Sequence, residues 1–233
     1  MQSAEQLNST WDGDAAGYDA LRNSWLNQRR DLYCLEFLKA AQPGDTVFEL
    51  GSGTGSSLIW LAQQRPDLLF VGIEPLKNYC DYGTAKAKEL KVGNVEFLCG
   101  YGEDAQRILE NRPRATWIIS TDVLHHVKDL RLTAEQMDAI SAPTAKWLSF
   151  EPSYLNPYIF YYQATAPGER NFWPGEFLKA AELTWRLNSK SYITVIPSFV
   201  PNPSPVLKAI ERALEGVPVV CGRRVSVLSK VSR

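Results

Sequence analysis

The chain has 233 residues, 45% of them hydrophobic and 22% charged, with a formal net charge of −1. This is the composition of an ordinary globular protein, long enough for one large α/β domain. A net charge near zero attracts no polyanion, so we expect a small, weakly charged partner molecule and no nucleic acid. The four cysteines are widely spaced, without a CxxC pair, so neither a disulfide framework nor a metal site is predicted.

No targeting or membrane segment is predicted. The N-terminal stretch MQSAEQLNSTWDGD lacks the basic start and apolar core of a signal peptide, and no apolar run is long enough to span a membrane. The expected location is therefore the cytoplasm, with reduced thiols. Cys99 lies in an apolar strand-like run and is expected to be buried.

The front of the chain is predicted to be helical. Tyr18, Leu21, Arg22 and Trp25 recur at the spacing of one helix face, and a second helix is expected over 29–40, before the Pro43-Gly44 turn. We expect residues 1–43 to form a helical cap over one edge of a sheet.

From residue 46 onward, strand-like and helix-like runs alternate. Strands are predicted at 46–50, 68–73, 95–99, 116–121 and 146–150, and helices at 56–64, 76–90, 104–111 and 133–140. Continuous apolar strands that alternate with helices indicate βαβ units and a sheet covered on both faces. The predicted fold class is thus α/β, with a doubly wound, mostly parallel sheet.

The last third of the chain has a different pattern. Residues 152–175 are rich in Tyr, Pro and Asn without a clean period and are interpreted as an ordered insertion on the substrate side. A helix over 174–183, a strand over 191–196, a helix from Ser204-Pro205 to Gly216 and a strand over 225–228 are predicted to follow. No repeat or linker divides the chain, so residues 1–233 are predicted to form a single domain.

The most informative stretch is 46–56, where a strand leads through Glu49 into a loop with Gly51, Gly53 and Gly55. Such a loop lets a flat ligand approach backbone N–H groups closely. Glu74 closes the second strand, where a carboxylate can accept two hydrogen bonds from ribose hydroxyls. The segments GYGED at 100–104 and STDVLHHV at 120–127 follow the next two strands, at the edge where nucleosides bind in such sheets.

Together, the motifs FELGSGTG, VGIEP, GYGED and TDVLHHV resemble those of class I S-adenosylmethionine-dependent methyltransferases, of the small-molecule group with an LHH-type motif after the fourth strand. The resemblance covers at least residues 18–151. It implies a Rossmann-like, seven-stranded sheet with an antiparallel last strand. It also implies S-adenosyl-L-methionine as cofactor and S-adenosyl-L-homocysteine as product.

The resemblance also implies roles for single residues. The three loop glycines would pass under the methionine part, Glu49 would anchor its ammonium group, and Tyr18 would reach its carboxylate or close the pocket. Tyr101 stands where many relatives carry an aspartate, so the adenine contact could fall to Glu103, Asp104 or backbone, and Glu103 is preferred. The predicted cofactor-binding residues are Tyr18, Glu49, Gly51, Ser52, Gly53, Gly55, Glu74, Pro75, Gly102, Glu103 and Thr121.

The acceptor side is less well defined by the sequence. Methyl transfer is an in-line displacement that needs a base only for some acceptors. His125 and Asp122 are the candidate catalytic residues, although either could be structural, and His125 and His126 are expected to point in different directions. The predicted acceptor contacts are Glu151, Tyr154, Asn156, Tyr158, Tyr162 and Trp173.

An aromatic pocket suits an apolar or planar molecule, as in specialised metabolism, methylated on oxygen, nitrogen or carbon. A homodimer is left open. One alternative is a methyltransferase-fold protein that binds the cofactor without methyl transfer. The other is an NAD(P)-dependent oxidoreductase, although its phosphate-binding turn has the spacing G-x-G-x-x-G.

Overall fold

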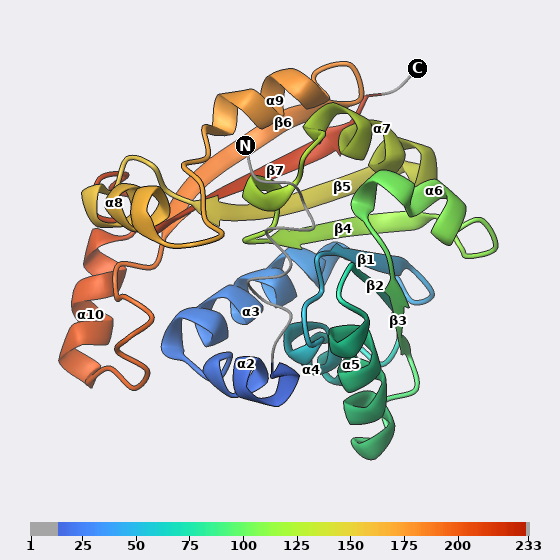
Figure 1. Ribbon diagram of the computed structural model, residues 1–233, viewed down its shortest axis with the longest axis horizontal. Coiled ribbons are helices and arrows are strands. Elements are labelled where there is room, and N and C mark those ends of the chain that lie inside the picture. Colours follow the sequence, from blue (N-terminus) through green and yellow to red (C-terminus); the bar gives the residue numbers. More distant parts are fainter. Residues whose placement is uncertain (1–13, 232–233) are drawn as a thin grey trace.

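The computed structural model describes residues 14–231. They form a seven-stranded sheet between two layers of helices (Figure 1). The strands are β1 Thr46–Leu50, β2 Leu69–Glu74, β3 Val95–Cys99, β4 Ala115–Thr121, β5 Ser141–Pro152, β6 Trp185–Ile193 and β7 Arg223–Lys230. Their order is β3-β2-β1-β4-β5-β7-β6, and only β7 runs antiparallel to its neighbours. The predicted fold class is confirmed.

The helices follow the strands in chain order. They are α2 Ala15–Leu21, α3 Trp25–Phe37, α4 Ser56–Gln64, α5 Lys77–Glu89, α6 Ala105–Ile108, α7 Leu130–Ile140, α8 Pro157–Thr165, α9 Pro174–Ala181 and α10 Pro205–Leu214. Short 3-10 helices are η1 Leu38–Ala40, η2 Gly102–Asp104 and η3 Leu124–His126. Side chains of Ser24, Asp129, Asn156 and Ser204 cap the starts of α3, α7, α8 and α10 by accepting backbone N–H groups.

Two apolar cores hold the layers together. One lies between the sheet and α3, α4 and α5, and the other lies between the sheet and α6, α7 and α9. Trp147 is fully buried in the second, with its ring 5.1 Å from that of Phe177 and 5.3 Å from that of Trp185. Its Nε1–H donates to Ser120 Oγ at 2.9 Å, so β4, β5, β6 and α9 meet at one indole.

The sequence and the structure differ mainly after β4. Residues 152–175 contain α8, which a periodic pattern could not reveal because both its faces carry aromatic side chains. The strand predicted at 191–196 is β6, which begins at Trp185 and ends before Thr194, a residue with a left-handed φ of 60°. The helix predicted over 104–111 is reduced to α6.

Two further expectations concern single features. Cys99 is exposed rather than buried, because β3 is the edge strand of the sheet. None of the helices within residues 14–231 is long and apolar enough to cross a membrane. The division into a cap at 1–43 and an insertion at 152–175 stays a prediction, and residues 1–13 of that cap lie outside the described part.

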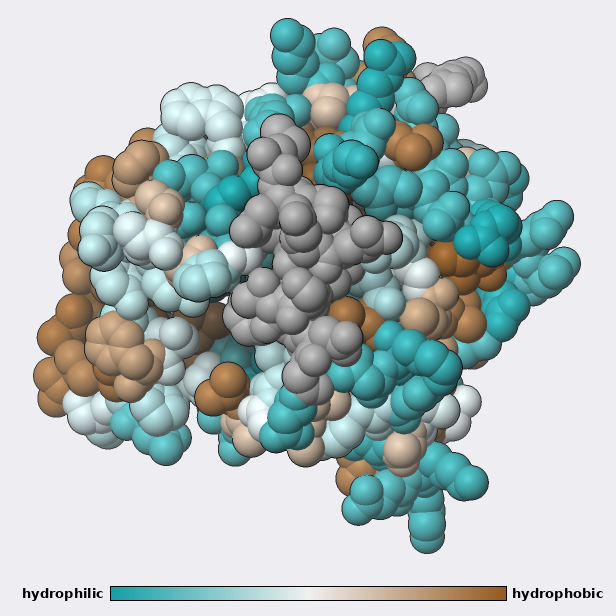
Figure 2. All heavy atoms as spheres, viewed as in Figure 1, coloured by the Kyte–Doolittle hydropathy of each residue, from teal (hydrophilic) through white to brown (hydrophobic). Residues whose placement is uncertain are grey.

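The surface over α10 is the most apolar part of the face in Figure 2. Val206, Leu207, Ile210 and Leu214 of α10 are exposed there, on the left of the view. Helix α8 also exposes Tyr158, Phe160 and Tyr161. The helices of the last third are therefore the least covered part of the described fold.

Candidate functional site

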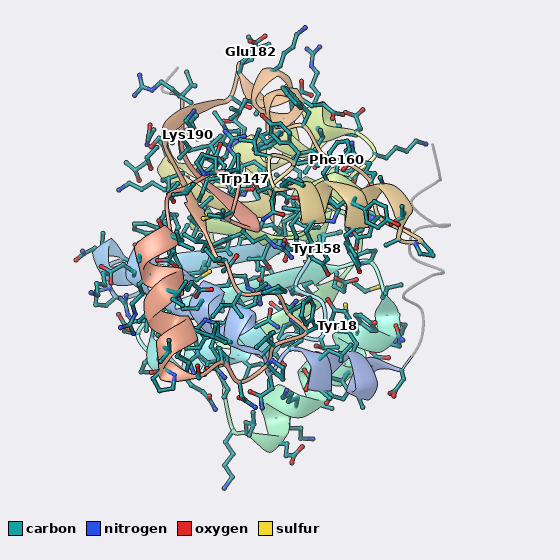
Figure 3. All side chains as sticks on the ribbon, turned by 90° about the vertical axis from the view of Figure 1, so that its left-hand side faces the viewer. Tyr18, Trp147, Tyr158, Phe160, Glu182 and Lys190 are labelled. Carbon is teal, nitrogen blue, oxygen red and sulfur yellow. The ribbon has the colours of Figure 1, made fainter. Side chains whose placement is uncertain are left out.

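A cavity of about 500 Å³ opens at the carboxyl ends of β1, β2 and β4. Its walls come from the loops after these strands, from α2, from α8 and from residues 194–198 and 222–223. Tyr18 of α2 and Tyr158 of α8 reach the cavity from two separate segments (Figure 3). This is the edge at which parallel α/β sheets bind ligands.

The three loop glycines have different surroundings. All have positive φ angles, 72° at Gly51, 54° at Gly53 and 77° at Gly55. A Cβ at Gly51 would collide with Val123, and one at Gly55 would collide with Phe97. Gly53 meets only the ring of Tyr18, at 3.5 Å, and so faces the cavity. Gly55 does not line the cavity and precedes α4 as its N-cap residue, packed against Phe97; its contact with a cofactor stays a prediction.

Glu74 is buried at the end of β2 and lines the cavity. Its carboxylate accepts from the backbone N–H of Gly53 at 2.9 Å and from that of Leu76 at 3.1 Å. Burial raises the pKa of Glu74, and the two N–H groups oppose that rise. The carboxylate is therefore fixed toward the glycine loop and has lone pairs to spare for a ligand.

Glu49 lies behind the loop and does not line the cavity. It is buried, one carboxylate oxygen lies 3.5 Å from Thr121 Oγ1, and the other has no hydrogen-bond partner in the described part of the chain. Burial raises the pKa of Glu49 to about 7, although Arg30 and Arg22 oppose that rise. Glu49 could contact a cofactor ammonium group directly only if the residues between it and the cavity moved.

Helix α2 is held to the glycine loop by Asp19. This carboxylate accepts from Thr54 Oγ1 at 3.0 Å, from Ser56 Oγ and from Lys86 Nζ at 2.5 Å. The clamp places Tyr18 and Arg22 on the cavity wall, with the Tyr18 ring 5.1 Å from that of Tyr79. Arg22 was missed by the sequence analysis, although it lies on the same predicted helix face as Tyr18.

The third loop brings Tyr101, Gly102 and Glu103 to the cavity. A Cβ at Gly102 would collide with Leu50, so only glycine lets this loop lie against β1. Pro75 and Ser52 also line the cavity here, as predicted for cofactor contacts. Which side chain meets an adenine amino group stays a prediction.

The loop after β4 contains a non-glycine residue in the left-handed region. Asp122 has a φ of 53°, and its carboxylate lies 2.7 Å from Nε of Arg223, the first residue of β7. Burial alone would raise the pKa of Asp122, but the positive charges of Arg223, Arg30, His125 and Arg22 together lower it. Asp122 is therefore an ionised partner of Arg223 at the cavity wall, next to Thr121.

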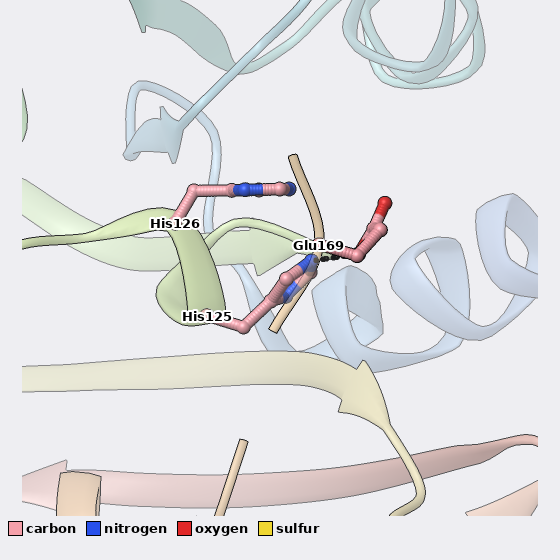
Figure 4. A group of neighbouring side chains, drawn as sticks. All are labelled: His125, His126 and Glu169. Atoms are coloured by element: carbon pink, nitrogen blue, oxygen red, sulfur yellow. Dashed lines mark ion pairs between the residues drawn. The ribbon is translucent and has the colours of Figure 1, made fainter. Parts of the chain in front are cut away.

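His125 is held between two carboxylates. Its Nδ1 lies 2.7 Å from Glu151 Oε2, and its Nε2 lies 3.2 Å from Glu169 Oε2 (Figure 4). Burial alone would lower the pKa of His125, but the two glutamates outweigh it and raise that pKa to about 9. With this pKa the ring carries both protons at neutral pH and donates to both glutamates, and a catalytic role for His125 stays a prediction.

His126 lies beside His125 rather than pointing away from it. The ring centroids are 4.0 Å apart because both residues lie in the tight turn of η3, so the expected divergence of the two side chains is wrong. Burial and the charge of His125 lower the pKa of His126 to about 4. At neutral pH His126 is an uncharged imidazole that faces the cavity.

The acceptor side of the cavity contains some of the predicted residues and lacks others. Asn156, Tyr158 and Tyr162 line it. Glu151, Tyr154 and Trp173 do not line it, and their contact with an acceptor stays a prediction. Glu151 lies behind His125, where it also accepts from the N–H of Leu124 at 2.8 Å. The rings of Tyr154 and Trp173 pack on each other instead, 4.2 Å apart.

Gln163 is a second residue that the sequence analysis missed. It is buried on α8 and lines the cavity, and within residues 14–231 neither its amide oxygen nor its amide nitrogen has a hydrogen-bond partner. A buried amide without partners is costly unless a ligand or water binds it. Gln163 thus provides a polar group on the acceptor side of the cavity, among the aromatic side chains of Tyr158 and Tyr162.

Comparison with known proteins places this geometry in context. Residues 44–115 match a family model described as "Putative methyltransferase". Among solved structures, geranyl diphosphate C-methyltransferase from Streptomyces coelicolor A3(2), crystallised with S-adenosyl-L-homocysteine, has a TM-score of 0.66 at 17% identity, over 88% of this chain and 80% of that one. The [4+2]-cyclase SpnF has a TM-score of 0.73 at 12% identity, over 100% of this chain and 98% of that one.

The fold is that of the S-adenosylmethionine-dependent methyltransferases. The predicted Rossmann-like sheet is thereby confirmed, and the predicted cofactor and enzyme class agree with these neighbours. The family match spans the region from just before β1 to the start of β4, which is the cofactor side of the cavity.

Curated relatives match only in part. A tRNA (guanine-N(7)-)-methyltransferase of Shewanella pealeana is 42% identical over 67 residues, 29% of this chain and 27% of that protein. One from Limosilactobacillus reuteri is 33% identical over 63 residues, 27% of this chain and 30% of that protein. The chain thus spans less than a third of the length of these relatives.

These relatives correct the expected partners. The sequence analysis expected a small-molecule acceptor and excluded nucleic acid, whereas the matching relatives are named for methylating guanine in tRNA. The exclusion is contradicted because it rested on the net charge of the whole chain, which does not describe a local surface. Specialised metabolism and a cytoplasmic location stay predictions.

Proposed function

We propose that this protein is an S-adenosyl-L-methionine-dependent methyltransferase. The observation that carries the proposal is the buried carboxylate of Glu74, fixed by the backbone N–H of Gly53 at the edge of a cavity that is also lined by Tyr18, Gly102 and Glu103. These are the positions at which the resemblance calls for ribose, methionine and adenine contacts.

The residues present fit this cofactor. Glu74 offers two carboxylate oxygens to the ribose hydroxyls, and Gly53 leaves space that a side chain would fill. Arg22, on the wall beside Tyr18, carries the charge that a methionine carboxylate needs, with its guanidinium 5.9 Å from the Tyr18 ring centroid. When bound, the cofactor supplies a methyl group on a cationic sulfur, already activated for transfer.

The chain's own contribution to transfer is alignment and exclusion of water. The cavity is closed on one side by α2 and on the other by α8, so an acceptor would be held between them. Gln163 would orient a polar group of the acceptor. We infer that the Leu124-His125-His126 segment marks the acceptor end of the cavity, as in the LHH group that the sequence resembles.

Two acceptor classes have a specific observation in their favour. The relatives are named for transfer to a guanine base of tRNA. The cavity of about 500 Å³, with aromatic side chains from α8, favours a group on an organic molecule of limited size. In either class the methyl group could be received by an oxygen, a nitrogen or a carbon atom, and the three products would differ in that bond.

A second candidate function is cofactor binding without methyl transfer. It is favoured by the likeness to SpnF, which is named as a [4+2]-cyclase and yet has this fold. In that case the same cavity would bind the cofactor, but no methyl group would leave it. A NAD(P)-dependent oxidoreductase would instead bind NADH.

Calorimetric titration of the full chain with S-adenosyl-L-homocysteine, and separately with NADH, tests the cofactor. Binding of the first ligand alone is expected, and Glu74→Gln should weaken it by about 1–3 kcal/mol. Exposed Glu182→Gln is the matched control and should leave the affinity unchanged. Binding of NADH alone, or equal affinities for wild type and Glu74→Gln, would contradict the assignment.

Incubation with methyl-labelled cofactor tests transfer. Unmodified tRNA transcripts in one arm and a panel of organic hydroxyl, amine and activated-carbon acceptors in the other distinguish the two acceptor classes. Label in either arm supports the methyltransferase. Cofactor affinity without label in any arm supports the second candidate function.

A further inference from the structure

Three side chains with metal-binding atoms converge at the acceptor end of the cavity. His125 and His126 come from η3, and Glu169 comes from the loop between α8 and α9 (Figure 4). One ligand atom from each lies within 4.8 Å of the others, and all three residues line the cavity. Two imidazoles and a carboxylate thus face one shared point that small molecules can reach.

The orientation of His125 suits a metal ligand. Its Nδ1 lies 2.7 Å from Glu151 Oε2, and the other oxygen of Glu151 accepts the N–H groups of Val123 at 3.2 Å and Leu124 at 2.8 Å. A carboxylate on one ring nitrogen fixes the ring and directs the other nitrogen forward, which is how metal-bound histidines are usually supported. Nε2 of His125 is thereby aimed at Glu169.

The loop that carries Glu169 is also held in place. Arg170 Nε donates to the backbone carbonyl of His125 at 2.5 Å, so the residue next to Glu169 is tied to the turn that carries both histidines. Glu169 Oε2 lies 3.2 Å from His125 Nε2. Ligand atoms around a tetrahedral zinc ion lie roughly 3.4 Å apart, so this edge of a coordination sphere is already formed.

We infer that His125, His126 and Glu169 form a binding site for a divalent transition-metal ion, with Zn²⁺ as the best match. Imidazole ligands favour zinc over magnesium or calcium, and two histidines with one glutamate is a ligand set of zinc sites that keep a position open. The ion would take the place of the proton that His125 shares with Glu169, and that proton would be released to solvent.

The nearby charges are compatible with a cation. The carboxylates around the cluster are those of Glu151, Glu169 and Asp122, and the guanidiniums are those of Arg170 and Arg223. Asp122 and Arg223 pair with each other. Glu151, Glu169 and Arg170 together carry a net charge of −1 when both imidazoles are neutral.

An ion at this point would have its open position toward the cavity. There it would bind a water molecule or an oxygen atom of the acceptor and lower the pKa of that group. This role rests on the proposed function, whereas metal binding itself does not.

Zinc titration of the full chain, first treated with EDTA and dialysed, tests the site. Wild type is expected to bind one zinc ion per chain, measured by calorimetry and by elemental analysis after dialysis. His126→Ala and Glu169→Gln should each weaken binding roughly tenfold or more, and Glu151→Gln, which acts through His125, should weaken it by about 10–100-fold. Glu182→Gln is the matched control, since Glu182 is exposed after the end of α9 and is not one of the residues that form or support the site.

Two results would overturn the site: a folded wild type that binds no zinc at this stoichiometry, or zinc affinity that persists in both His126→Ala and Glu169→Gln. Circular dichroism of each sample reports folding. Titration of the same samples with S-adenosyl-L-homocysteine tests the proposed function separately. Loss of zinc binding with retained S-adenosyl-L-homocysteine binding contradicts only the metal site, and the reverse result contradicts only the cofactor assignment.

Discussion

The two sides of the cavity are built in different ways. On the cofactor side, the glycine loop, Glu74 and the loop at Gly102 each follow a strand directly, and backbone N–H groups fix the key carboxylate. On the acceptor side, α8, residues 194–198 and Arg223 meet from distant parts of the chain, and the contacts are made by side chains. One side is determined by local chain geometry, and the other depends on tertiary packing.

The largest expected effect tests the packing beneath the acceptor side. Trp147→Ala should lower the free energy of unfolding by about 3–5 kcal/mol, because it empties a buried site between Phe177 and Trp185. Trp173→Ala is the matched control, at 59% exposure, and should cost under about 1.5 kcal/mol. Urea denaturation measures both. Similar losses would show that the exposed aromatics contribute as much to stability as the core.

The next effect concerns the wall of the cofactor side. Between pH 4.5 and about 7, folded Glu49 keeps a proton that the unfolded chain has lost, because its pKa rises to about 7 on folding. The free energy of unfolding should therefore fall as the pH rises through this window, and the part of that fall due to Glu49 is about 3 kcal/mol.

Glu49→Gln should remove this dependence and be more stable than wild type above pH 7. Urea denaturation across this pH range measures the difference between the two proteins. Glu36→Gln, at an exposed site, should follow wild type. Parallel pH profiles for wild type and Glu49→Gln would refute an ionisable group buried behind the loop.

A smaller effect separates backbone strain from crowding in the glycine loop. Gly55→Ala should cost about 1–3 kcal/mol more than Gly44→Ala, since both have positive φ but only Gly55 would press a Cβ into Phe97. Thermal or urea denaturation of the two variants gives the difference directly. Equal losses would mean that the loop moves away from Phe97 at little cost.

The smallest effect belongs to the acceptor side. Gln163→Leu should leave stability unchanged or slightly higher, because a buried amide without partners is removed at similar volume. Once an acceptor is known, its KM should rise by a factor that corresponds to about 0.5–1.5 kcal/mol, with unchanged S-adenosyl-L-homocysteine affinity. A loss of cofactor affinity instead would place Gln163 on the other side of the cavity.

The same contrast explains what the sequence could predict. The strands β1 and β3 and the helix α4 were predicted to the residue, since their apolar runs and glycine punctuation are local signals. Within the predicted cofactor set, Glu74, Gly53 and Gly102 line the cavity. Gly55 does not, because spacing alone cannot tell a ligand contact from a packing contact.

The acceptor side lacks such signals. Glu169 lies in a loop without any motif, and only tertiary packing brings it to His125. Glu151 lies near the end of β5, where the sequence predicts an acceptor contact, and its carboxylate lies 2.7 Å from Nδ1 of His125. Arg22 could have been found, because it shares a helical face with Tyr18 and carries the charge that a carboxylate ligand needs.

The order of the strands has a consequence for synthesis of the chain. β7 is synthesised after β6, yet it lies between β5 and β6, and β6 has no other sheet neighbour within residues 14–231. Until β7 has left the ribosome, the backbone hydrogen-bonding groups of β6 are unpaired and can pair with other chains. A nascent or C-terminally shortened chain should therefore aggregate through β6, while its first four strands can already form their sheet.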